Sequence, residues 1–195
     1  MAKNSGNGSI SSDDKLKVTI TSLEMFERPQ NLMLSSPHGK KTSLIRAFSP
    51  TISFYRYLYN TVGAPWLWWE RRSMSDESLT EIIKDQDVEV YVLYFDGVPA
   101  GYAELDRRNG STIDLAYLGL IPDFIGCKLG PYLLSSIIDI AWSYEPKRLT
   151  VNTCTLDHPK ALGVYQQCGF TVYDQSSKVI DDPRLSSIYA IKPDN

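Results

Sequence analysis

The chain has 195 residues and a mass of 22.0 kDa, and with 43% hydrophobic and 22% charged residues it can bury a substantial core as one domain. The net charge of −3 and the pI near 5.4 argue against a nucleic-acid binder, which needs clustered Lys and Arg. Three cysteines without CxxC spacing favour neither a disulfide framework nor a metal site. Without a run of 18 apolar residues or an apolar N-terminal segment, we expect no membrane span, no secretory signal and a cytoplasmic location.

The N-terminal end is polar. Residues 1–15 consist mainly of Gly, Ser, Asn and Asp, so we expect a disordered tail followed by a single domain over residues 16–195. Alternation of Val18 and Ile20 with polar residues predicts a strand at 17–22. The segment 25–41 is rich in Pro, Ser and Gly and is expected to be a loop.

Two helices and an aromatic segment follow. Ser49 and Pro50 are typical of a helix start, and Gly63 of its end. This segment and its continuation carry many aromatic residues, namely Phe54, Tyr55, Tyr57, Tyr59, Trp66, Trp68 and Trp69. The second helix is expected from Ser75 through Ile83.

The rest of the chain alternates between strand and helix patterns. Strands are predicted at 88–95, 98–107, 112–121, 148–153, 170–173 and 185–191, and helices at 129–141 and 159–168. Asp96-Gly97 and Asn109-Gly110 are tight-turn signals that join the first three of these strands. The order β-α-α-β-β-β-α-β-α-β-β predicts an α/β sandwich with an antiparallel first half.

A glycine-containing loop joins the strand at 112–121 to the following helix. Gly126 and Gly130 flank the helix start, where free backbone N–H groups and the helix dipole favour an anion such as a pyrophosphate. The loop lacks the GK[ST] ending of a Walker motif. The alternative is a plain strand–helix turn that uses glycine for a tight bend.

A second motif lies at 153–170. Ala161 and Tyr165 are four residues apart and therefore share one helix face, and Gly169-Phe170 follows the helix. Taken alone, Tyr165 is more typical of a buried aromatic residue with a satisfied hydroxyl than of an acid.

Together and in this order, the two segments resemble motifs of the GNAT superfamily of acetyl-CoA-dependent N-acetyltransferases, over roughly residues 89–173. The family's acyl-CoA loop has Arg or Gln, two residues, Gly, one residue, and Gly or Ala, and aligns with residues 125–130. Its later motif, N-x-x-A-x-x-x-Y-x-x-x-G-F, aligns with residues 158–170. The aromatic front half and the TCTLDHP stretch are similar to a bacterial subgroup of the superfamily. The resemblance implies a mixed, mostly antiparallel central sheet flanked by helices.

Three positions depart from the family pattern. Ile125 replaces Arg or Gln, Lys128 replaces Gly, and His158 replaces Asn. If position 128 requires a positive φ, Lys there costs about 1–2 kcal/mol, although its ammonium can pair with a phosphate of coenzyme A. We therefore expect weaker coenzyme A affinity than is usual for the family.

The resemblance also implies where acetyl-CoA binds. The pantetheine arm is expected to pair with the strand before the loop, like an added β-strand, in an opening toward the strand at 148–153. The implied cofactor-binding residues are Gly119, Leu120, Ile121, Gly126, Cys127, Lys128, Leu129, Gly130, Pro131, His158 and Ala161. Gly119 also fits a bulge or a close backbone approach.

For catalysis, the family pattern assigns Tyr165 as the acid that protonates the leaving thiolate, and a backbone N–H from Leu120 is expected to meet the carbonyl oxygen. Asp114 and Glu104 are alternative bases, or else solvated charges on strands. A two-residue turn at Asn109-Gly110 would place Glu104 opposite Leu115, and Asp114 on the other face with Ala103 and Leu105. A nucleophilic Cys127 with ping-pong kinetics is the less favoured route.

The aromatic segment is the expected acceptor wall. Aromatic faces attract ammonium groups, so Tyr55, Tyr59, Trp66, Trp68 and Trp69 are candidate substrate-binding residues, while the alternative is that many of them are core. The resemblance thus implies direct acetyl transfer, in a ternary complex, to a primary amine on a small molecule or peptide. The alternatives are a catalytically silent acyl-CoA sensor and a purely structural protein. No nucleic acid, membrane or metal is expected as a partner, and the protein is expected to be a monomer or homodimer.

Overall fold

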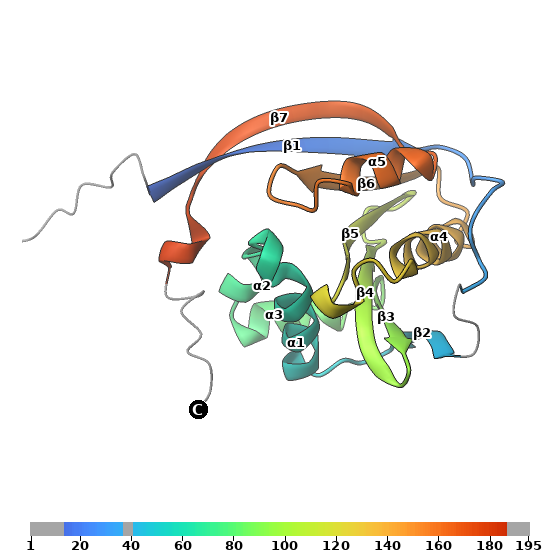
Figure 1. Ribbon diagram of the computed structural model, residues 1–195, viewed down its shortest axis with the longest axis horizontal. Helices are drawn as coiled ribbons and strands as arrows, with labels where there is room; N and C mark the ends of the chain where they lie inside the picture. Colours follow the sequence, from blue (N-terminus) through green and yellow to red (C-terminus); the bar gives the residue numbers. More distant parts are fainter. Residues whose placement is uncertain (1–13, 37–40, 187–195) are drawn as a thin grey trace, which may run out of the picture.

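The computed structural model describes residues 14–36 and 41–186 and contains one seven-stranded sheet with helices on both faces (Figure 1). The strands are β1 (Lys15–Met25), β2 (Thr42–Ala47), β3 (Val88–Phe95), β4 (Val98–Asp106), β5 (Thr112–Leu120), β6 (Arg148–Cys154) and β7 (Thr171–Asp181). The helices are α1 (Ile52–Gly63), α2 (Glu70–Ser73), α3 (Asp76–Ile83), α4 (Leu129–Trp142) and α5 (Ala161–Gln167).

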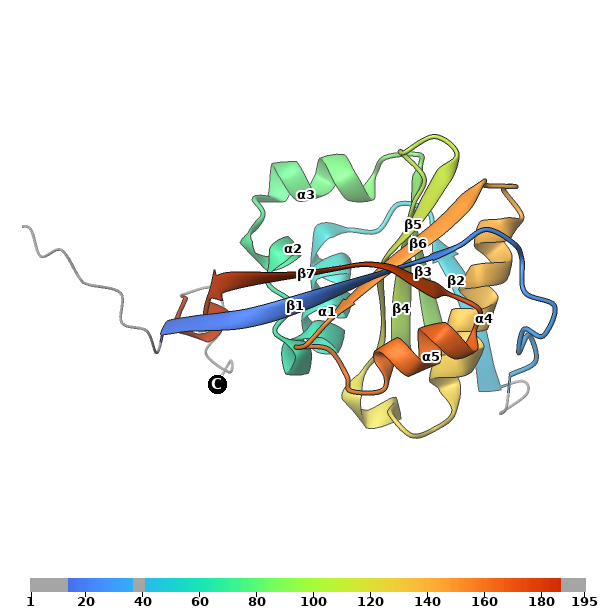
Figure 2. The ribbon, with the colours of Figure 1, turned by 90° about the horizontal axis from the view of Figure 1, so that it is seen from above.

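The strand order is β2-β3-β4-β5-β6-β1-β7. The β5–β6 pair is parallel, and the other five pairs are antiparallel. A mixed, mostly antiparallel sheet is therefore confirmed. Figure 2 shows α1, α2 and α3 on one side of β4 and β5, and α4 and α5 on the other.

The element order differs from the prediction at both ends of the chain. Residues 42–47, which directly follow the predicted loop at 25–41 and had no predicted element, form β2, which pairs with β3 at the edge of the sheet, so two strands precede α1. Strand β7 is longer than expected because it continues to Asp181 along β1, although its residues up to Val179 are exposed and carry no apolar alternation. Of the predicted strand 185–191, Leu185 ends a short 3-10 turn, and 187–191 lie outside the described residues.

The N-terminal expectation shifts by one residue. Strand β1 begins at Lys15, which the prediction counted in the tail, and it ends at Met25 instead of residue 22. Residues 1–13 of the expected tail lie outside the described residues.

Two apolar clusters fix the helices on the sheet. Side chains of α4, such as Leu133 and Ile137, pack with Leu105 on one face of the sheet, as the four-residue periodicity of this helix predicts. On the other face, Leu58 of α1 packs with Tyr102. Because alternate residues of a strand point to opposite faces, β4 contributes to both clusters.

The two central strands part halfway along their length. Strands β5 and β6 pair only from Thr112↔Arg148 to Leu115↔Val151. Beyond this point β5 stays on β4, as far as Gly101↔Leu120, while β6 stays on β1, as far as Ile20↔Cys154. The sheet thus opens beside α4, at the place where the family resemblance implied an opening.

Candidate active site

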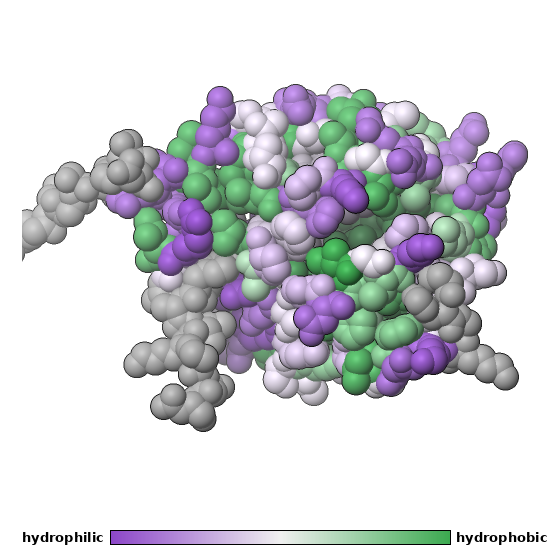
Figure 3. Space-filling model, viewed as in Figure 1, coloured by the Kyte–Doolittle hydropathy of each residue, from purple (hydrophilic) through white to green (hydrophobic). Residues whose placement is uncertain are grey.

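A cavity of about 630 Å³ lies at the opening between β5 and β6. Its walls come from β5, the end of β6, the loop before α4, α5, the α1–α2 connection and the β1–β7 pair. The surface is hollowed here, below β1 and β7 in the view of Figure 3. A cavity of this size is in the usual range for a small-molecule or cofactor site.

The loop before α4 contributes Gly126, Lys128 and Gly130 to the cavity lining. Gly126 and Lys128 have φ of +91° and +60°, so the chain adopts left-handed conformations directly before Leu129. The N–H groups of Leu129 and Gly130 belong to the first helical residues, which have no acceptor within the helix, and no side chain caps this end. A positive φ at Lys128 costs about 1–2 kcal/mol relative to glycine, and the residue lines the cavity.

The predicted cofactor-binding residues divide into two groups. Those that line the cavity are Gly119, Leu120, Gly126, Lys128, Gly130, Pro131, His158 and Ala161. Outside the lining lie Ile121, Cys127 and Leu129, of which Ile121 and Leu129 are buried. Leu129 contributes a core side chain and a backbone N–H at the helix start.

Gly119 allows close packing of α1 against β5. A Cβ atom at this position would lie 2.4 Å from Cγ1 of Val62 and 3.6 Å from Cη2 of Trp68. The expected close backbone approach is therefore present. The bulge in β5 lies elsewhere, because the register shifts between Tyr117 and Leu115.

The connection between β4 and β5, and not this bulge, sets which face Asp114 occupies. Glu104 pairs with Tyr117 instead of Leu115, and Asp106 pairs with Asp114. The connection between the strands spans residues 107–111 and is longer than the expected two-residue turn, so Asp114 lies on the face of Asp106 and Glu104, and the expectation that it joins Ala103 and Leu105 is wrong. The bulge at Ala116 shifts only the pairing of Tyr117 and later residues.

Neither predicted base lines the cavity. Glu104 is fully buried, with Oε1 2.6 Å from Nη2 of Arg71 and a hydrogen bond from Tyr55 Oη. Asp114 accepts a hydrogen bond of 2.7 Å from Thr150 Oγ1, and burial raises its pKa. Proton transfer by Glu104 would require opening a buried ion pair.

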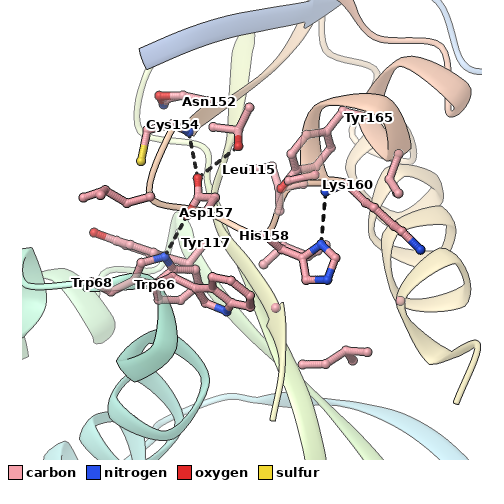
Figure 4. Close-up of a pocket in the computed structure, with 18 of the residues that line it drawn as sticks. Trp66, Trp68, Leu115, Tyr117, Asn152, Cys154, Asp157, His158, Lys160 and Tyr165 are labelled. Carbon is pink, nitrogen blue, oxygen red and sulfur yellow. Dashed lines mark hydrogen bonds between the residues drawn. The ribbon is translucent and has the colours of Figure 1, made fainter. Parts of the chain in front are cut away.

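Tyr165 reaches the cavity from α5, on the side opposite Trp68 (Figure 4). Its side chain is 8% exposed and packs edge-on against Phe170, with ring centroids 5.9 Å apart. Burial raises its pKa, and the negative charge of Asp157 adds to this effect. The phenol therefore keeps its proton at neutral pH.

Asp157 links two walls of the cavity, and sequence analysis missed this role. Its Oδ2 accepts hydrogen bonds from Thr153 Oγ1 (3.0 Å) and the Cys154 N–H (2.8 Å), and its Oδ1 accepts one from Trp68 Nε1 (3.2 Å) (Figure 4). An Asp directly after a strand and before a helix is a frequent turn residue, so the sequence did contain a local signal. The bond to Trp68, 89 positions away, has no such signal.

His158 is oriented by its own turn. Its Nδ1 accepts a hydrogen bond of 3.1 Å from the Lys160 N–H, and its ring lies 5.3 Å from that of Trp66. The other ring nitrogen, Nε2, makes no bond within this turn, so it can donate to a ligand.

The aromatic residues separate into core and wall. Tyr55 and Tyr59 are fully buried between α1 and β4 and do not line the cavity, so they do not form the expected acceptor wall. Trp66, Trp68 and Trp69 do line it. Two further lining residues, Tyr117 and Glu70, were not among the predicted site residues.

Among the described residues, neither a metal-binding cluster nor a membrane-spanning helix is present. Within residues 14–36 and 41–186, no group of three or more His, Cys, Asp or Glu side chains is arranged to hold a metal ion. None of the helices in the same ranges is long and apolar enough to cross a membrane.

Comparisons with solved structures agree with this fold. A functionally unknown conserved protein from Staphylococcus epidermidis superposes with a TM-score of 0.61 at 13% identity, covering 90% of this chain and 69% of that one. A GCN5-related N-acetyltransferase from Kribbella flavida gives 0.54 at 13% identity, with 88% and 62% coverage. A GNAT family acetyltransferase from Elizabethkingia anophelis with acetyl-CoA bound gives 0.50 at 18% identity, with 69% and 79% coverage.

At these sequence identities the structural similarities establish the fold alone. A search of curated proteins found no match. The family model is more specific. The model described as the acetyltransferase (GNAT) family matches residues 55–170, which is more than half of the chain and includes both motifs and most of the cavity. The chain therefore belongs to the GNAT family and is an acyl-CoA N-acetyltransferase.

Proposed function

We propose that the protein transfers an acetyl group from acetyl-CoA directly to a primary amine of a small molecule or peptide, with both substrates bound together. The observation that carries this proposal is that one cavity joins the N-terminal end of α4, the parted strands and Tyr165. The structural relative from Elizabethkingia anophelis, which has acetyl-CoA bound, supports the choice of donor. Acetyl-CoA would supply the thioester, whose carbonyl carbon is the electrophile.

The residues of the loop and of α4 would hold the diphosphate. The N–H groups of Leu129 and Gly130 and the positive end of the helix dipole attract an anion, and the ammonium of Lys128 adds a positive charge at the same end. The edge of β5 from Gly119 onward would pair with the pantetheine arm. Its orientation is favourable, because the Ile121 N–H bonds to Ala100 O on the β4 side. Successive N–H groups of a strand point to opposite sides, so the Leu120 N–H faces the opening and would stabilise negative charge on the thioester oxygen.

Tyr165 would protonate the leaving sulfur. Its pKa is raised, so the phenol carries the proton that it has to donate. Direct transfer is favoured over a covalent enzyme intermediate because burial also raises the pKa of Cys154, the cysteine in the lining, and keeps it as a thiol.

The second candidate is a silent acyl-CoA-binding module. It is favoured by the position of Glu104 and Asp114, since neither predicted base lines the cavity. Calorimetry with acetyl-CoA, followed by a thiol-release assay with polyamines, aminoglycosides, amino acids and peptide N-termini, separates the two. Binding with amine-dependent thiol release supports the transferase, binding without release supports the module, and no binding excludes both.

A further inference from the structure

The cavity contains a carboxylate that the roles above leave unassigned. Glu70 lines the cavity at the start of α2, and its Oε2 accepts a hydrogen bond of 2.9 Å from Tyr117 Oη. Tyr117 lies on β5 just beyond Leu115, the last residue that pairs with β6. Glu70 is thus held beside the point where the sheet opens, on the α1–α3 face.

Glu70 still has capacity to accept hydrogen bonds from a ligand. Asp157, the other carboxylate among the described lining residues, already accepts three hydrogen bonds. For Glu70, the described residues provide one donor and no ion-pair partner, and its side chain is exposed to solvent. A carboxylate has about four acceptor positions, so a primary ammonium with three donors fits the remaining ones.

The surroundings of Glu70 are apolar on two sides. Trp68 packs against Tyr117 with ring centroids 5.2 Å apart, and Trp69 lines the same region. Across the cavity, the β1–β7 pair presents Val18 and Ile180. A ligand whose ammonium binds Glu70 therefore places its carbon body between aromatic and aliphatic walls.

Lys178 limits the ligand class, and it is one of three lysines among the described lining residues, with Lys128 and Lys160. Lys178 lies opposite Val18 in the β1–β7 register and also lines the cavity. A second ammonium on the ligand would meet this like charge, whereas an apolar body would not. The walls thus favour monoamines over polyamines.

We infer that Glu70 is the catalytic residue that binds the acceptor's ammonium and removes a proton from it, and that the acceptor is a primary monoamine on an apolar or aromatic body. This inference rests on the proposed function. The neutral amine forms the N–C bond to the acetyl carbonyl carbon as the C–S bond breaks. Of the two protons that the ammonium loses, one passes through Glu70 to solvent, and the other replaces the proton that Tyr165 gives to the sulfur.

Glu70 and Tyr165 are suitably separated for these two tasks. Tyr165 enters the cavity from α5, whereas Tyr117, the hydrogen-bond partner of Glu70, lies with Trp68 on the other side (Figure 4). The acceptor and the leaving sulfur would then meet between them, at the parted strands.

The test compares wild type with Glu70→Gln and with Glu81→Gln, an exposed charge on α3 outside the cavity lining. Thiol release is measured with 2-phenylethylamine, which is cationic at neutral pH, and with 2,2,2-trifluoroethylamine, which is neutral. Glu70→Gln should lower kcat/KM roughly 10²-fold for the first amine and less than about tenfold for the second, which needs no proton acceptor before attack. Glu81→Gln should stay within about twofold for both, as a surface charge far from the chemistry.

Binding of 2-phenylethylamine to the coenzyme A-loaded protein provides an independent measurement by calorimetry. Glu70→Gln should weaken it about tenfold, and Glu81→Gln should not. Equal rates and equal affinities for wild type and Glu70→Gln would overturn the inference, as would a higher kcat/KM for spermidine than for 2-phenylethylamine. If the wild type binds the amine in a Glu70-dependent way but releases no thiol with any amine, the proposed transfer is refuted and the ammonium site is supported.

Discussion

Replacement of Arg71 by Met tests whether Glu104 is a structural residue. Arg71 Nη2 lies 2.6 Å from Glu104 Oε1, and the two side chains are 10% and 0% exposed. Burial is the largest single effect and lowers the pKa of Arg71. The charge and hydrogen bond of Glu104, together with Tyr55 and Tyr117, outweigh it, so the net shift is upward. Methionine keeps the apolar volume and removes the charge, so it leaves the carboxylate buried without a cation.

The expected loss of unfolding free energy is set by whichever costs less free energy, keeping the unpaired carboxylate buried or protonating it. Breaking one side of a buried pair costs about 3–5 kcal/mol. The orphaned carboxylate can instead take up a proton, and protonating a glutamate of ordinary pKa about 4.3 at pH 7 costs about 3.7 kcal/mol. Arg71→Met should therefore lower the free energy of unfolding by about 3–4 kcal/mol at pH 7. The loss should shrink to about 1 kcal/mol at pH 5, because the protonation cost falls as the pH approaches the ordinary value.

Urea unfolding followed by circular dichroism at both pH values measures this, with Arg71→Met/Glu104→Gln as the matched double variant. The double variant should recover at least about 2 kcal/mol at pH 7, because no unpaired charge remains. If Arg71→Met is within about 1 kcal/mol of wild type at pH 7, or if its loss is the same at pH 5, the assignment of Glu104 to a buried structural pair is refuted. In that case a role for Glu104 as base regains support.

Four further predictions concern Tyr165, Lys128 and Gly119. Tyr165→Phe should lower kcat about 10²-fold and leave the calorimetric affinity for acetyl-CoA within about threefold; unchanged kcat would remove the acid role. Because its pKa is raised, Tyr165 should stay protonated as the pH rises, so kcat should show no fall from its deprotonation between about pH 7 and 9. Lys128→Gly should raise the free energy of unfolding by about 1 kcal/mol or less, because it relieves the positive φ. The same change should weaken acetyl-CoA binding about tenfold at low salt, and stronger binding would contradict a phosphate contact. Gly119→Ala should destabilise the protein by about 1–3 kcal/mol, because the new Cβ would meet Val62 at 2.4 Å, and a neutral effect in urea unfolding would show that α1 can shift freely.

The local patterns of the sequence predicted most of the sheet, and the family resemblance predicted residues of the loop before α4 that line the cavity. The four-residue periodicity of α4 and the tight turn at Asp96-Gly97 are properties of short segments, and the structure has both. Strand β2 was missed because it is a short edge strand of six residues directly after a segment rich in Pro, Ser and Gly, and its order comes from pairing with β3. The length of β7 was underestimated for a similar reason, since pairing with β1 extends it through exposed residues.

The acceptor side depended on long-range packing. The connection between β4 and β5 is longer than the two-residue turn that Asn109-Gly110 predicted, and this placed Asp114 on the face of Glu104. Tyr55 and Glu104, two expected site residues, are buried with Arg71 and belong to the core. The turn at Leu67 places Trp68 beside Asp157, and Glu70 beside Tyr117.

The sequence by itself thus indicated, through two short motifs and the family that they resemble, that a glycine-flanked helix start and Tyr165 come together, and in the structure both line one cavity. Which carboxylate faces the cavity was decided only by tertiary structure, since a side chain's face depends on strand register and its charge on partners far away in the sequence.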